Sequence, residues 1–317
     1  MNTAIISGAT GFIGSTLVNY LLDKNYKVIA LGRKSFSDIK LSRLKPHRNL
    51  IYIKIDMQNI SNLKKIIDKN YKKFITNNSY FYHFAWGGED SLSDLNVKSQ
   101  LKNVIFTNEA LNVSEAIGIK KFIYVGTMEE EFTKKYLDLN YKLDSFYNRH
   151  VIYALAKLAA RNTLKASFNQ KKIKIIFATN SHVMGPKDDR DSFLQITLKK
   201  VLYNQDLVLA PCDQYFDVIS SLDCVRAYRL IGERGRNFEN YWVGSGNPRI
   251  LKEYVEIIAR MYKYEKKLNF SGLSINEIPL NKNDFSIENL KKDTGFSPLM
   301  TFEDTVKILK ETTFPDL

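Results

Sequence analysis

The chain has few residues that could build a disulfide framework or a metal centre. Its 317 residues include two cysteines, Cys212 and Cys224, which excludes a disulfide scaffold and is typical of a reducing cytoplasm. The four histidines lie far apart in the sequence and show no zinc-ligand spacing. We therefore expect no bound metal and a cytoplasmic location.

Long apolar runs are absent as well. No run reaches the roughly 20 residues that span a bilayer, and the N-terminus lacks the basic and apolar regions of a secretory signal. We therefore expect no membrane partner. Hydrophobic residues make up 44% of the chain and charged residues 26%, which excludes a mostly disordered or coiled-coil protein and is typical of a globular enzyme.

Positive charge is in excess, with 47 Lys and Arg against 34 Asp and Glu and a net charge of +13. A basic surface attracts nucleic acids or phosphorylated small molecules. The lysines are dispersed, however, and the sequence has no arginine-rich tract and no alternation of aromatic and basic residues. We therefore expect no nucleic-acid partner.

Short β-rich apolar runs alternate with amphipathic helical stretches in the first half of the chain. The predicted strands cover residues 3–7, 27–31, 50–55, 80–84, 121–126 and 174–178, and the predicted helices 13–23, 61–69, 98–117 and 152–169. This alternation predicts an α/β fold with a Rossmann-type, doubly wound parallel sheet. Ligands of such sheets bind outside the carboxyl ends of the strands.

The alternation loosens after Gly185 and Pro186, where helical stretches at 193–203, 222–231 and 252–261 lie among short strands. This pattern predicts a smaller C-terminal α/β lobe that closes over the edge of the sheet. The predicted dinucleotide-binding domain comprises residues 1–178 and 213–245. The predicted substrate lobe comprises residues 179–212 and 246–317.

A glycine-rich turn follows the first predicted strand and opens the first predicted helix. It reads Gly8-Ala9-Thr10-Gly11-Phe12-Ile13-Gly14. Gly8 permits a tight turn, Gly11 leaves room for a pyrophosphate near the backbone, and Gly14 lets the helix pack closely on the strand. The helix dipole and the first N–H groups would face that pyrophosphate. The turn, with Thr10, Phe12 and Ile13, is therefore predicted to bind a dinucleotide, and an ordinary tight turn is the alternative.

The end of the second predicted strand bears on the choice between NAD and NADP. An acidic residue there would bind the ribose 2′-hydroxyl of NAD, whereas this chain has Arg33, Lys34 and Ser35. Arg33 can pair with a 2′-phosphate, which favours NADP(H) over NAD(H). The alternative is a solvated charge stacked on the adenine. Asp56, followed by Met57, is predicted to meet the adenine amino group.

Tyr153 and Lys157 share one face of a predicted helix because they are four residues apart. The same spacing starts at Tyr20 and at Tyr262, but only Tyr153 follows the fifth predicted strand, near the carboxyl ends of the sheet. A neighbouring ammonium and an oxidised nicotinamide would lower the pKa of the phenol toward the working pH. With Thr127 as a second donor, these residues predict an acid/base site for hydride transfer between an alcohol or ketone and a nicotinamide.

The ordered set of motifs resembles the extended short-chain dehydrogenases/reductases, which include nucleotide-sugar epimerases, dehydratases and 4-ketoreductases. Further matches are His83-Phe84-Ala85, Asn103-Val104, Tyr124-Val125-Gly126-Thr127, Gly185-Pro186, Phe216-Asp217, Leu222-Asp223 and Gly295-Phe296-Ser297-Pro298. The resemblance covers nearly the whole chain and implies that Thr127, Tyr153 and Lys157 are catalytic. It also implies that Ala85 lines the nicotinamide ribose, and that Asn103 either supports the lysine through water or packs the start of its helix.

One departure from the family pattern bears on the reaction. Sugar dehydratases of the family carry Asp-Glu after the catalytic threonine, whereas this chain has Met128-Glu129. Methionine cannot donate a proton, so 4,6-dehydration is disfavoured although Glu129 remains. The alternative interpretation of residues 129–131 is a solvated run of charge.

Other departures concern the substrate pocket. His182 stands where the family usually has asparagine, as in some 4-ketoreductases of the family, and a satisfied core histidine is the alternative. The two arginines that usually bind the diphosphate are missing, so Arg190 and Arg249, or nearby lysines, are predicted to replace them. The predicted substrate-binding residues are Trp86, Glu129, Asn180, His182, Arg190, Asp217 and Arg249.

We expect an NADP(H)-dependent 4-ketoreductase of a GDP-, CDP- or dTDP-linked 4-keto sugar, of the kind used in surface polysaccharide biosynthesis. The alternatives are an NAD-dependent 4-epimerase or 4-dehydrogenase and, without catalysis, a redox-sensing or RNA-binding protein of the same fold. The resemblance also implies a homodimer through the helices at 98–117 and 152–169. Asn108, Leu111, Val113 and Phe168 are expected either at that contact or in the core.

Overall fold

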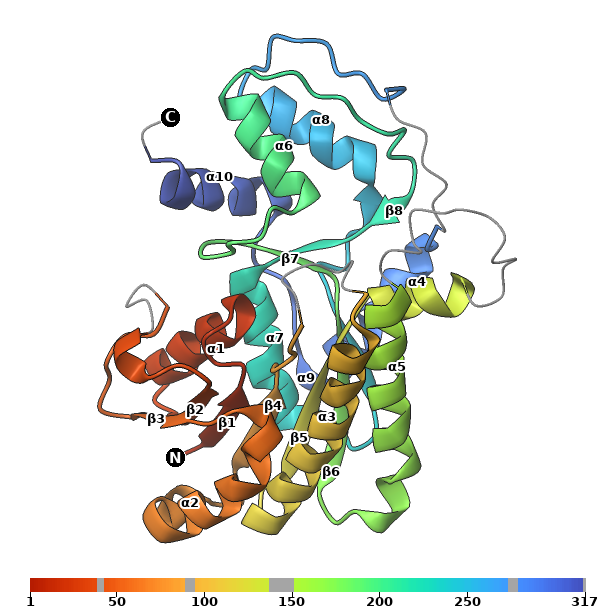
Figure 1. Cartoon of the computed structure of the whole chain (residues 1–317). Helices are drawn as coiled ribbons and strands as arrows, with labels where there is room; N and C mark the ends of the chain where they lie inside the picture. The colour runs from red at the N-terminus through yellow and green to blue at the C-terminus, as the bar shows by residue number, and fades with distance from the viewer. Residues whose placement is uncertain (39–42, 89–94, 137–150, 273–278, 316–317) are drawn as a thin grey trace.

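A seven-stranded parallel sheet forms the centre of the protein (Figure 1), whose computed structural model describes residues 1–38, 43–88, 95–136, 151–272 and 279–315. The strand order is β10-β6-β5-β4-β1-β2-β3, which is the doubly wound arrangement predicted from the sequence. The strands are β1 (Thr3–Ser7), β2 (Lys27–Gly32), β3 (Leu50–Lys54), β4 (Ser79–His83), β5 (Lys121–Thr127), β6 (Lys174–Asn180) and β10 (Asn240–Val243).

Helices cover both faces of the sheet because the apolar side chains of each strand alternate between two cores. On β1, Ala4 and Ile6 belong to one core and Ile5 to the other. The first core is covered by α1 (Phe12–Asp23), α7 (Ser221–Arg234) and α9 (Glu288–Thr294), and the second by α2 (Leu63–Asn70), α3 (Val97–Ile117) and α5 (Val151–Ala166). No helix in the described ranges is long and apolar enough to cross a membrane.

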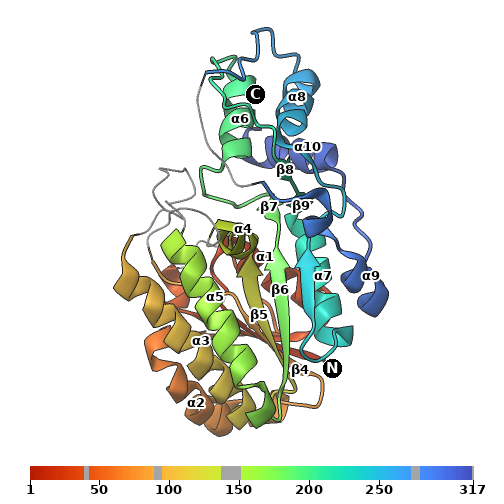
Figure 2. The same cartoon turned by 90° about the vertical axis from the view of Figure 1, so that its right-hand side faces the viewer.

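A smaller group of elements lies beyond the carboxyl ends of the strands (Figure 2). Here α6 (Phe193–Leu202), α8 (Leu251–Met261) and α10 (Phe302–Thr313) pack around a third core that includes Leu198, Ile258 and Val306. Two short strand pairs accompany them, namely β7 (His182–Met184) with β9 (Val218–Ser220), and β8 (Tyr215–Phe216) with β11 (Arg249–Ile250). The predicted C-terminal lobe is therefore present.

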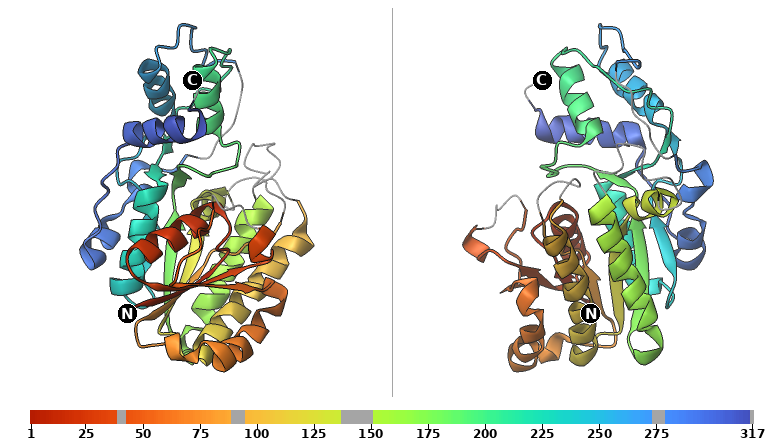
Figure 3. Two further views of the ribbon diagram at one scale, coloured as in Figure 1. Left: turned by 90° about the vertical axis from the view of Figure 1, so that its left-hand side faces the viewer. Right: turned by 45° about the vertical axis from the view of Figure 1, so that its right-hand side comes forward.

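The segment around α9 differs from the predicted lobe boundary. Phe285, Leu290 and Phe296 join the core of the sheet, and the Phe285 ring meets the Trp242 ring edge-on at 5.4 Å. Figure 3 shows α9 beside α7 and away from the three lobe helices. The chain therefore returns to the sheet before it enters α10.

Candidate active site

Two adjoining cavities follow the carboxyl ends of the strands. One has a volume of about 320 Å³ and the other about 400 Å³. Their walls share Gly8, Gly11, Phe84 and Trp86, so the two form one continuous cleft. A cleft at this edge of a doubly wound sheet is where such folds bind dinucleotides.

The glycine turn leaves the middle of this cleft open. Gly8 has φ +67°, and a Cβ there would lie 2.8 Å from the backbone N of Ala85. A Cβ on Gly14 would collide with the Gly8 carbonyl, whereas a Cβ on Gly11 would meet nothing nearer than that carbonyl at 3.4 Å. Helix α1 starts after Gly11 with no side-chain cap and no acidic residue in its first turn. These features fit a pyrophosphate at the helix N-terminus.

The larger cavity receives Arg33, Asp56 and Met57, which are predicted to hold the adenosine end of a cofactor. Its lining also includes Thr10 of the glycine turn, Asn103, and Ala85, which is predicted at the nicotinamide ribose. The Asp56 carboxylate also accepts a hydrogen bond from the backbone N of Gln58 at 3.0 Å and so caps the following 3₁₀ turn.

Lys34 and Ser35, also predicted at this end, do not line the cavity. The Lys34 carbonyl accepts from the Tyr52 hydroxyl at 2.7 Å, and the Ser35 hydroxyl accepts from Lys54 Nζ at 3.1 Å. Lys54 ends β3 opposite Gly32 and adds a cation beside this group of residues. Sequence reasoning missed Lys54 because the register that brings β3 to β2 is not visible in the local sequence.

Asn103 is held by the loop that follows β4. Its Oδ1 accepts from the Gly87 N–H at 2.7 Å, and its Nδ2 donates to the Gly87 carbonyl at 2.8 Å. These contacts pack the start of α3, which is one of the two roles considered for Asn103. Trp86, in the same loop, donates its indole N–H to Gln100 Oε1 at 2.8 Å and lines both cavities.

The three predicted catalytic residues meet in the smaller cavity. Thr127, Tyr153 and Lys157 all line its wall, and the Thr127 side chain lies near enough to the phenol to lower its pKa. Lys157 Nζ donates to the Val125 carbonyl at 3.0 Å and lies 3.9 Å from the centre of a Trp86 ring. Tyr153 and Trp86 meet edge-on at 6.1 Å. Because the glycine turn lines the same cavity, the phenol and the amine lie beside the predicted dinucleotide site.

Burial controls the ionisation of both groups. It raises the pKa of Tyr153, Glu129 and Glu130 raise it further, and Thr127 and Arg190 oppose them. Burial lowers the pKa of Lys157 to about 7, and the Glu130 charge opposes this change. Without a cofactor, burial therefore outweighs the groups that lower the pKa of the phenol, and the lowering predicted for Lys157 with an oxidised nicotinamide stays a prediction. Tyr153 stays protonated at neutral pH, as an acid must before it gives up a proton.

The segment after Thr127 forms an unpredicted helix, α4 (Glu129–Tyr136). Met128 and Glu129 are 8% and 6% exposed and line the smaller cavity, and Glu130 is fully buried. Only Glu131 is partly solvated, and it pairs with Lys134 at 2.6 Å. The alternative of a solvated charge run is therefore wrong for Glu129 and Glu130.

Asn180, His182 and Arg190 also line the smaller cavity. Asn180 Oδ1 accepts from the Tyr228 hydroxyl at 2.7 Å, and Arg190 makes a two-bond pair with Asp188 at 2.7 and 2.9 Å. His182 Nε2 is buried without a hydrogen-bond partner among the described residues. The alternative of a satisfied core histidine is therefore not what the structure shows. Burial lowers the pKa of His182 to about 4, so its ring is neutral at pH 7.

Two predicted substrate-binding residues lie outside this cleft. Asp217 is fully buried and accepts from the Ser181 hydroxyl at 2.5 Å and the Ser245 N–H at 3.0 Å, which ties the lobe to the sheet. Arg249 pairs with Glu303 at 3.1 Å and lines a separate cavity of about 140 Å³. Neither side chain is placed to meet a ligand beside Tyr153.

Comparison with known proteins identifies the family. The model of the NAD dependent epimerase/dehydratase family matches residues 4–244. The chain belongs to this family. It is an enzyme of the extended short-chain dehydrogenase/reductase type, as the order of its motifs predicts. CDP-abequose synthase of Salmonella muenchen is 24% identical over 306 residues, which cover 96% of this chain and 95% of the synthase.

Two solved structures illustrate the shared epimerase/dehydratase fold. The dTDP-glucose 4,6-dehydratase of Bacillus anthracis, in complex with NAD, has a TM-score of 0.76 and 21% identity, with 100% of this chain and 97% of that chain covered. The UDP-glucose 4-epimerase of Thermotoga maritima, with UDP-glucose, has a TM-score of 0.72 and 20% identity, with 98% of each chain covered. These similarities confirm the predicted Rossmann-type fold.

Proposed function

We propose that this enzyme is an NADP(H)-dependent 4-ketoreductase that acts on a nucleotide-activated 4-keto sugar. The observation that carries the proposal is the wall of the cavity beside Tyr153. Met128 occupies that wall where dehydratases of the family have an acid, and it cannot protonate a leaving hydroxyl. The half-buried phenol of Tyr153 keeps its proton at neutral pH, which suits protonation of the alkoxide that a ketone reduction produces.

Side chains of the protein would donate the proton, stabilise the reacting oxygen and hold the cofactor. A bound nicotinamide would supply the hydride. Tyr153 donates its proton to the new alkoxide, and the Thr127 hydroxyl donates a hydrogen bond to the same oxygen. Because these donors lie on the wall of a cavity and are partly shielded from solvent, their electrostatic contribution is larger than it would be in water. Lys157 lies one helical turn from Tyr153 and would hold the nicotinamide ribose.

The nucleotide sugar is supported by the relatives and by two polar groups of the cavity. CDP-abequose synthase and the solved epimerase with UDP-glucose carry nucleotide-sugar names. Arg190 lies at the cavity with its side chain 53% exposed, so it is available to a diphosphate. The unpartnered His182 Nε2 is available to a sugar hydroxyl or carbonyl. In this proposal residues 1–178 and 213–245 hold the dinucleotide, and most of the remaining chain holds the sugar.

The preference for NADP(H) is supported by the end of β2. Arg33 lines the larger cavity, and no acidic residue stands at positions 32–35. Arg33→Ala should weaken NADPH binding about tenfold or more and change NADH binding little, since a hydrogen bond to a charged group contributes about 1.5–3 kcal/mol. Fluorescence titration with both cofactors measures this. Lys34→Ala, outside the cavity, is the matched control, and equal losses in both variants would contradict the assignment.

A direct assay tests the reaction. The purified enzyme should oxidise NADPH when a CDP-, GDP- or dTDP-linked 4-keto-6-deoxy sugar is added. Mass spectrometry should find a product that is two hydrogens heavier than that sugar. The second candidate is an NAD-dependent 4-epimerase or 4-dehydrogenase, since the solved relatives include an epimerase and a complex with NAD. NAD that remains bound through purification, together with interconversion of C4 epimers without added cofactor, would replace the reductase by the epimerase.

We also infer that the enzyme works as a homodimer in the cytoplasm. Helices α3 and α5 lie side by side on one face of the sheet (Figure 3). Leu101 and Ile105 on α3 and Leu155 on α5 are 51%, 57% and 39% exposed. An apolar surface of this kind on two neighbouring helices suits a second copy of the chain.

The residues named for the dimer from the sequence serve other contacts. Leu111 and Val113 are buried in the core under the sheet, and the Phe168 ring lies 4.2 Å from that of Phe238. Asn108 donates to the Thr163 hydroxyl at 2.8 Å and so joins α3 to α5 within one chain. Of the two roles considered for these residues, the structure supports internal packing.

A further inference from the structure

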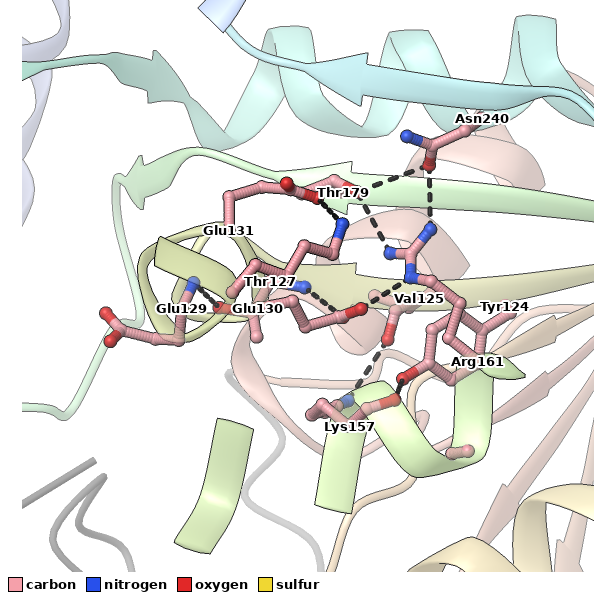
Figure 4. Close-up of polar contacts among 12 residues, drawn as sticks. Tyr124, Val125, Thr127, Glu129, Glu130, Glu131, Lys157, Arg161, Thr179 and Asn240 are labelled. Atoms are coloured by element: carbon pink, nitrogen blue, oxygen red, sulfur yellow. Dashed lines mark hydrogen bonds and ion pairs between the residues drawn. The ribbon is translucent and has the colours of Figure 1, made fainter. Parts of the chain in front are cut away.

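Next to Thr127 lies a buried ion pair that the proposed reaction does not use. Glu130 Oε2 accepts from Arg161 Nε at 2.5 Å, and the two side chains are 0% and 2% exposed (Figure 4). The other oxygen of Glu130, Oε1, accepts from the backbone N–H of Thr127 at 3.0 Å. One carboxylate therefore joins the end of β5, which carries Thr127, to helix α5, which carries Tyr153 and Lys157.

Arg161 extends the contact to two more strands. Its Nη1 donates to Asn240 Oδ1 on β10 at 2.8 Å, and its Nη2 donates to the Thr179 hydroxyl on β6 at 2.9 Å. A Cβ on Gly126 would collide with both Arg161 and Glu130, so the glycine at that position leaves the space that the pair fills. Each nitrogen of the Arg161 guanidinium and each oxygen of the Glu130 carboxylate therefore makes a hydrogen bond inside the protein.

A helix cap alone does not account for this arrangement. Thr127-Met128-Glu129-Glu130 has the Thr-x-x-Glu pattern of a capping box, and the Glu129 N–H lies 3.4 Å from the Thr127 hydroxyl oxygen. A capping glutamate needs only the hydrogen bond from the backbone N–H of the first residue, here that of Thr127, and its side chain can stay in water. Glu130 is instead removed from water together with an arginine 31 residues later, and burial of two charges is costly unless their geometry is good.

The pair also lies close to Lys157. Arg161 is one helical turn further along α5, and the Tyr124 hydroxyl donates to the Lys157 carbonyl at 2.9 Å. In the described part of the chain, the charged and titratable groups around Lys157 are His83 from β4, Tyr124 from β5, Glu130 from α4, and Tyr153 and Arg161 from α5. After burial, which lowers the pKa of Lys157, Glu130 raises it and Arg161 lowers it.

We propose that Glu130 is a positioning residue of the active site, with Arg161 as its counter-ion. The carboxylate fixes the Thr127 end of β5 against α5, and its charge offsets that of Arg161 beside Lys157. The consequence for catalysis rests on the proposed function, whereas the effect on Lys157 belongs to the protein without cofactor or substrate.

Titration of Lys157 in the protein without ligands tests the charge balance. The protein is labelled with ¹³C-lysine, and the Lys157 signal is assigned by its loss in Lys157→Arg. Glu130→Gln leaves the Arg161 charge without its counter-ion and should lower the pKa of Lys157 by about one unit. Glu130→Gln with Arg161→Gln removes both charges and should return most of that shift. Glu131→Gln, the same change one residue away, should leave the Lys157 titration unchanged.

Glu130→Asp tests the positioning. It keeps the charge but is one methylene shorter, so it cannot reach Thr127 and Arg161 together. The Lys157 titration and the shape of the pH profile should stay as in the wild type, while kcat falls about tenfold or more and the KM for NADPH changes little. This variant and the double variant keep the test decisive if Glu130→Gln does not fold.

The outcomes separate the two proposals. A Lys157 titration that is the same in Glu130→Gln and in the wild type overturns the charge balance, and an unchanged kcat in Glu130→Asp overturns the positioning. If the wild type reduces no 4-keto sugar, the proposed function fails, and the Lys157 titration still decides whether Glu130 offsets the charge of Arg161 beside Lys157.

Discussion

At the scale of single residues, the cleft holds groups that burial drives toward their neutral forms. Burial raises the pKa of the Tyr153 phenol, lowers that of Lys157 to about 7 and lowers that of His182 to about 4. At neutral pH the phenol therefore carries a proton and the imidazole does not. The Tyr153 phenol therefore offers a hydrogen-bond donor in place of a charge, which suits a substrate oxygen that becomes negative only during the reaction.

Tyr153→Phe removes the proposed proton donor and leaves the aromatic ring in place. We expect kcat to fall about 10²–10⁴-fold, the range for loss of a positioned acid, with NADPH affinity nearly unchanged. Single-turnover kinetics and fluorescence titration measure the two quantities. Tyr262→Phe is the matched control, because Tyr262 has the same spacing to a lysine but lies outside the cleft. Full activity of Tyr153→Phe would remove Tyr153 from the mechanism.

The sequence predicts the residues whose role depends on short-range spacing and misses those that depend on distant partners. Tyr153 and Lys157 could be placed together because they lie one helical turn apart. The burial of Glu130 could not be foreseen, because it depends on Arg161, which approaches only when α4 and α5 pack on the sheet. Arg249 was predicted at the substrate, but Glu303 holds it elsewhere.

At the scale of elements, the turn between β1 and α1 is the best-predicted part of the cleft. The predicted helix at 13–23 differs from α1 by one residue, because the strand, turn and helix signals are consecutive in the sequence. The helix α4 was missed for the opposite reason. Its three glutamates resemble solvent-exposed charge, and only the packed structure shows that two of them are inside.

The glycine turn gives a prediction that separates packing from binding. Gly14→Ala places a methyl group against the Gly8 carbonyl, so α1 must move away from β1, and both the melting temperature and cofactor binding should fall. Gly11→Ala meets only an ordinary contact at 3.4 Å, so the melting temperature should change little while NADPH binding is lost. Thermal melts and cofactor titrations of both variants test this contrast. Wild-type NADPH affinity in Gly11→Ala would place the pyrophosphate elsewhere.

His83 connects β1, β4 and α3 and makes their packing sensitive to acid. Its ring nitrogens lie 2.9 Å from the Ser7 hydroxyl and 3.1 Å from the Thr107 hydroxyl. Burial lowers the pKa of His83 to about 3 from 6.5, and the Lys157 charge adds to this effect. In the unfolded chain, His83 therefore binds a proton below about pH 6.5. In the folded protein, it binds that proton only near pH 3. This contribution to stability is complete above pH 6.5 and is lost as the pH falls.

We expect the free energy of unfolding to lose about 2 kcal/mol between pH 7 and pH 5 through His83 alone. Urea unfolding at the two pH values measures the loss. His83→Gln should be less stable than the wild type at pH 7 but should lose about 2 kcal/mol less on acidification. His47→Gln, at an exposed histidine, should lose as much as the wild type. The hypothesis fails if His83→Gln and the wild type respond equally to acid.

At the scale of the whole molecule, the lobe and the sheet share the walls of one cleft. Thr127 and Tyr153 come from the sheet side, and His182 and Arg190 from the segment that leads into the lobe. The order of the elements predicted this division, because a doubly wound sheet binds its ligands at the carboxyl ends of its strands. The return of the chain to the sheet around Phe285 was not predicted, since its partner Trp242 is far away in the sequence.

The proposed dimer concerns the outer surface of α3 and α5. Ile105 is 57% exposed there, and a second copy of the chain would cover it. Ile105→Glu would put one charge from each copy into an apolar contact, so we expect a monomer with an unchanged melting curve of the single chain. Light scattering after size-exclusion chromatography measures the mass. Leu299→Glu, at a leucine that is 70% exposed and far from these helices, should remain a dimer. A monomeric wild type, or a dimeric Ile105→Glu, would show that this surface does not join two copies.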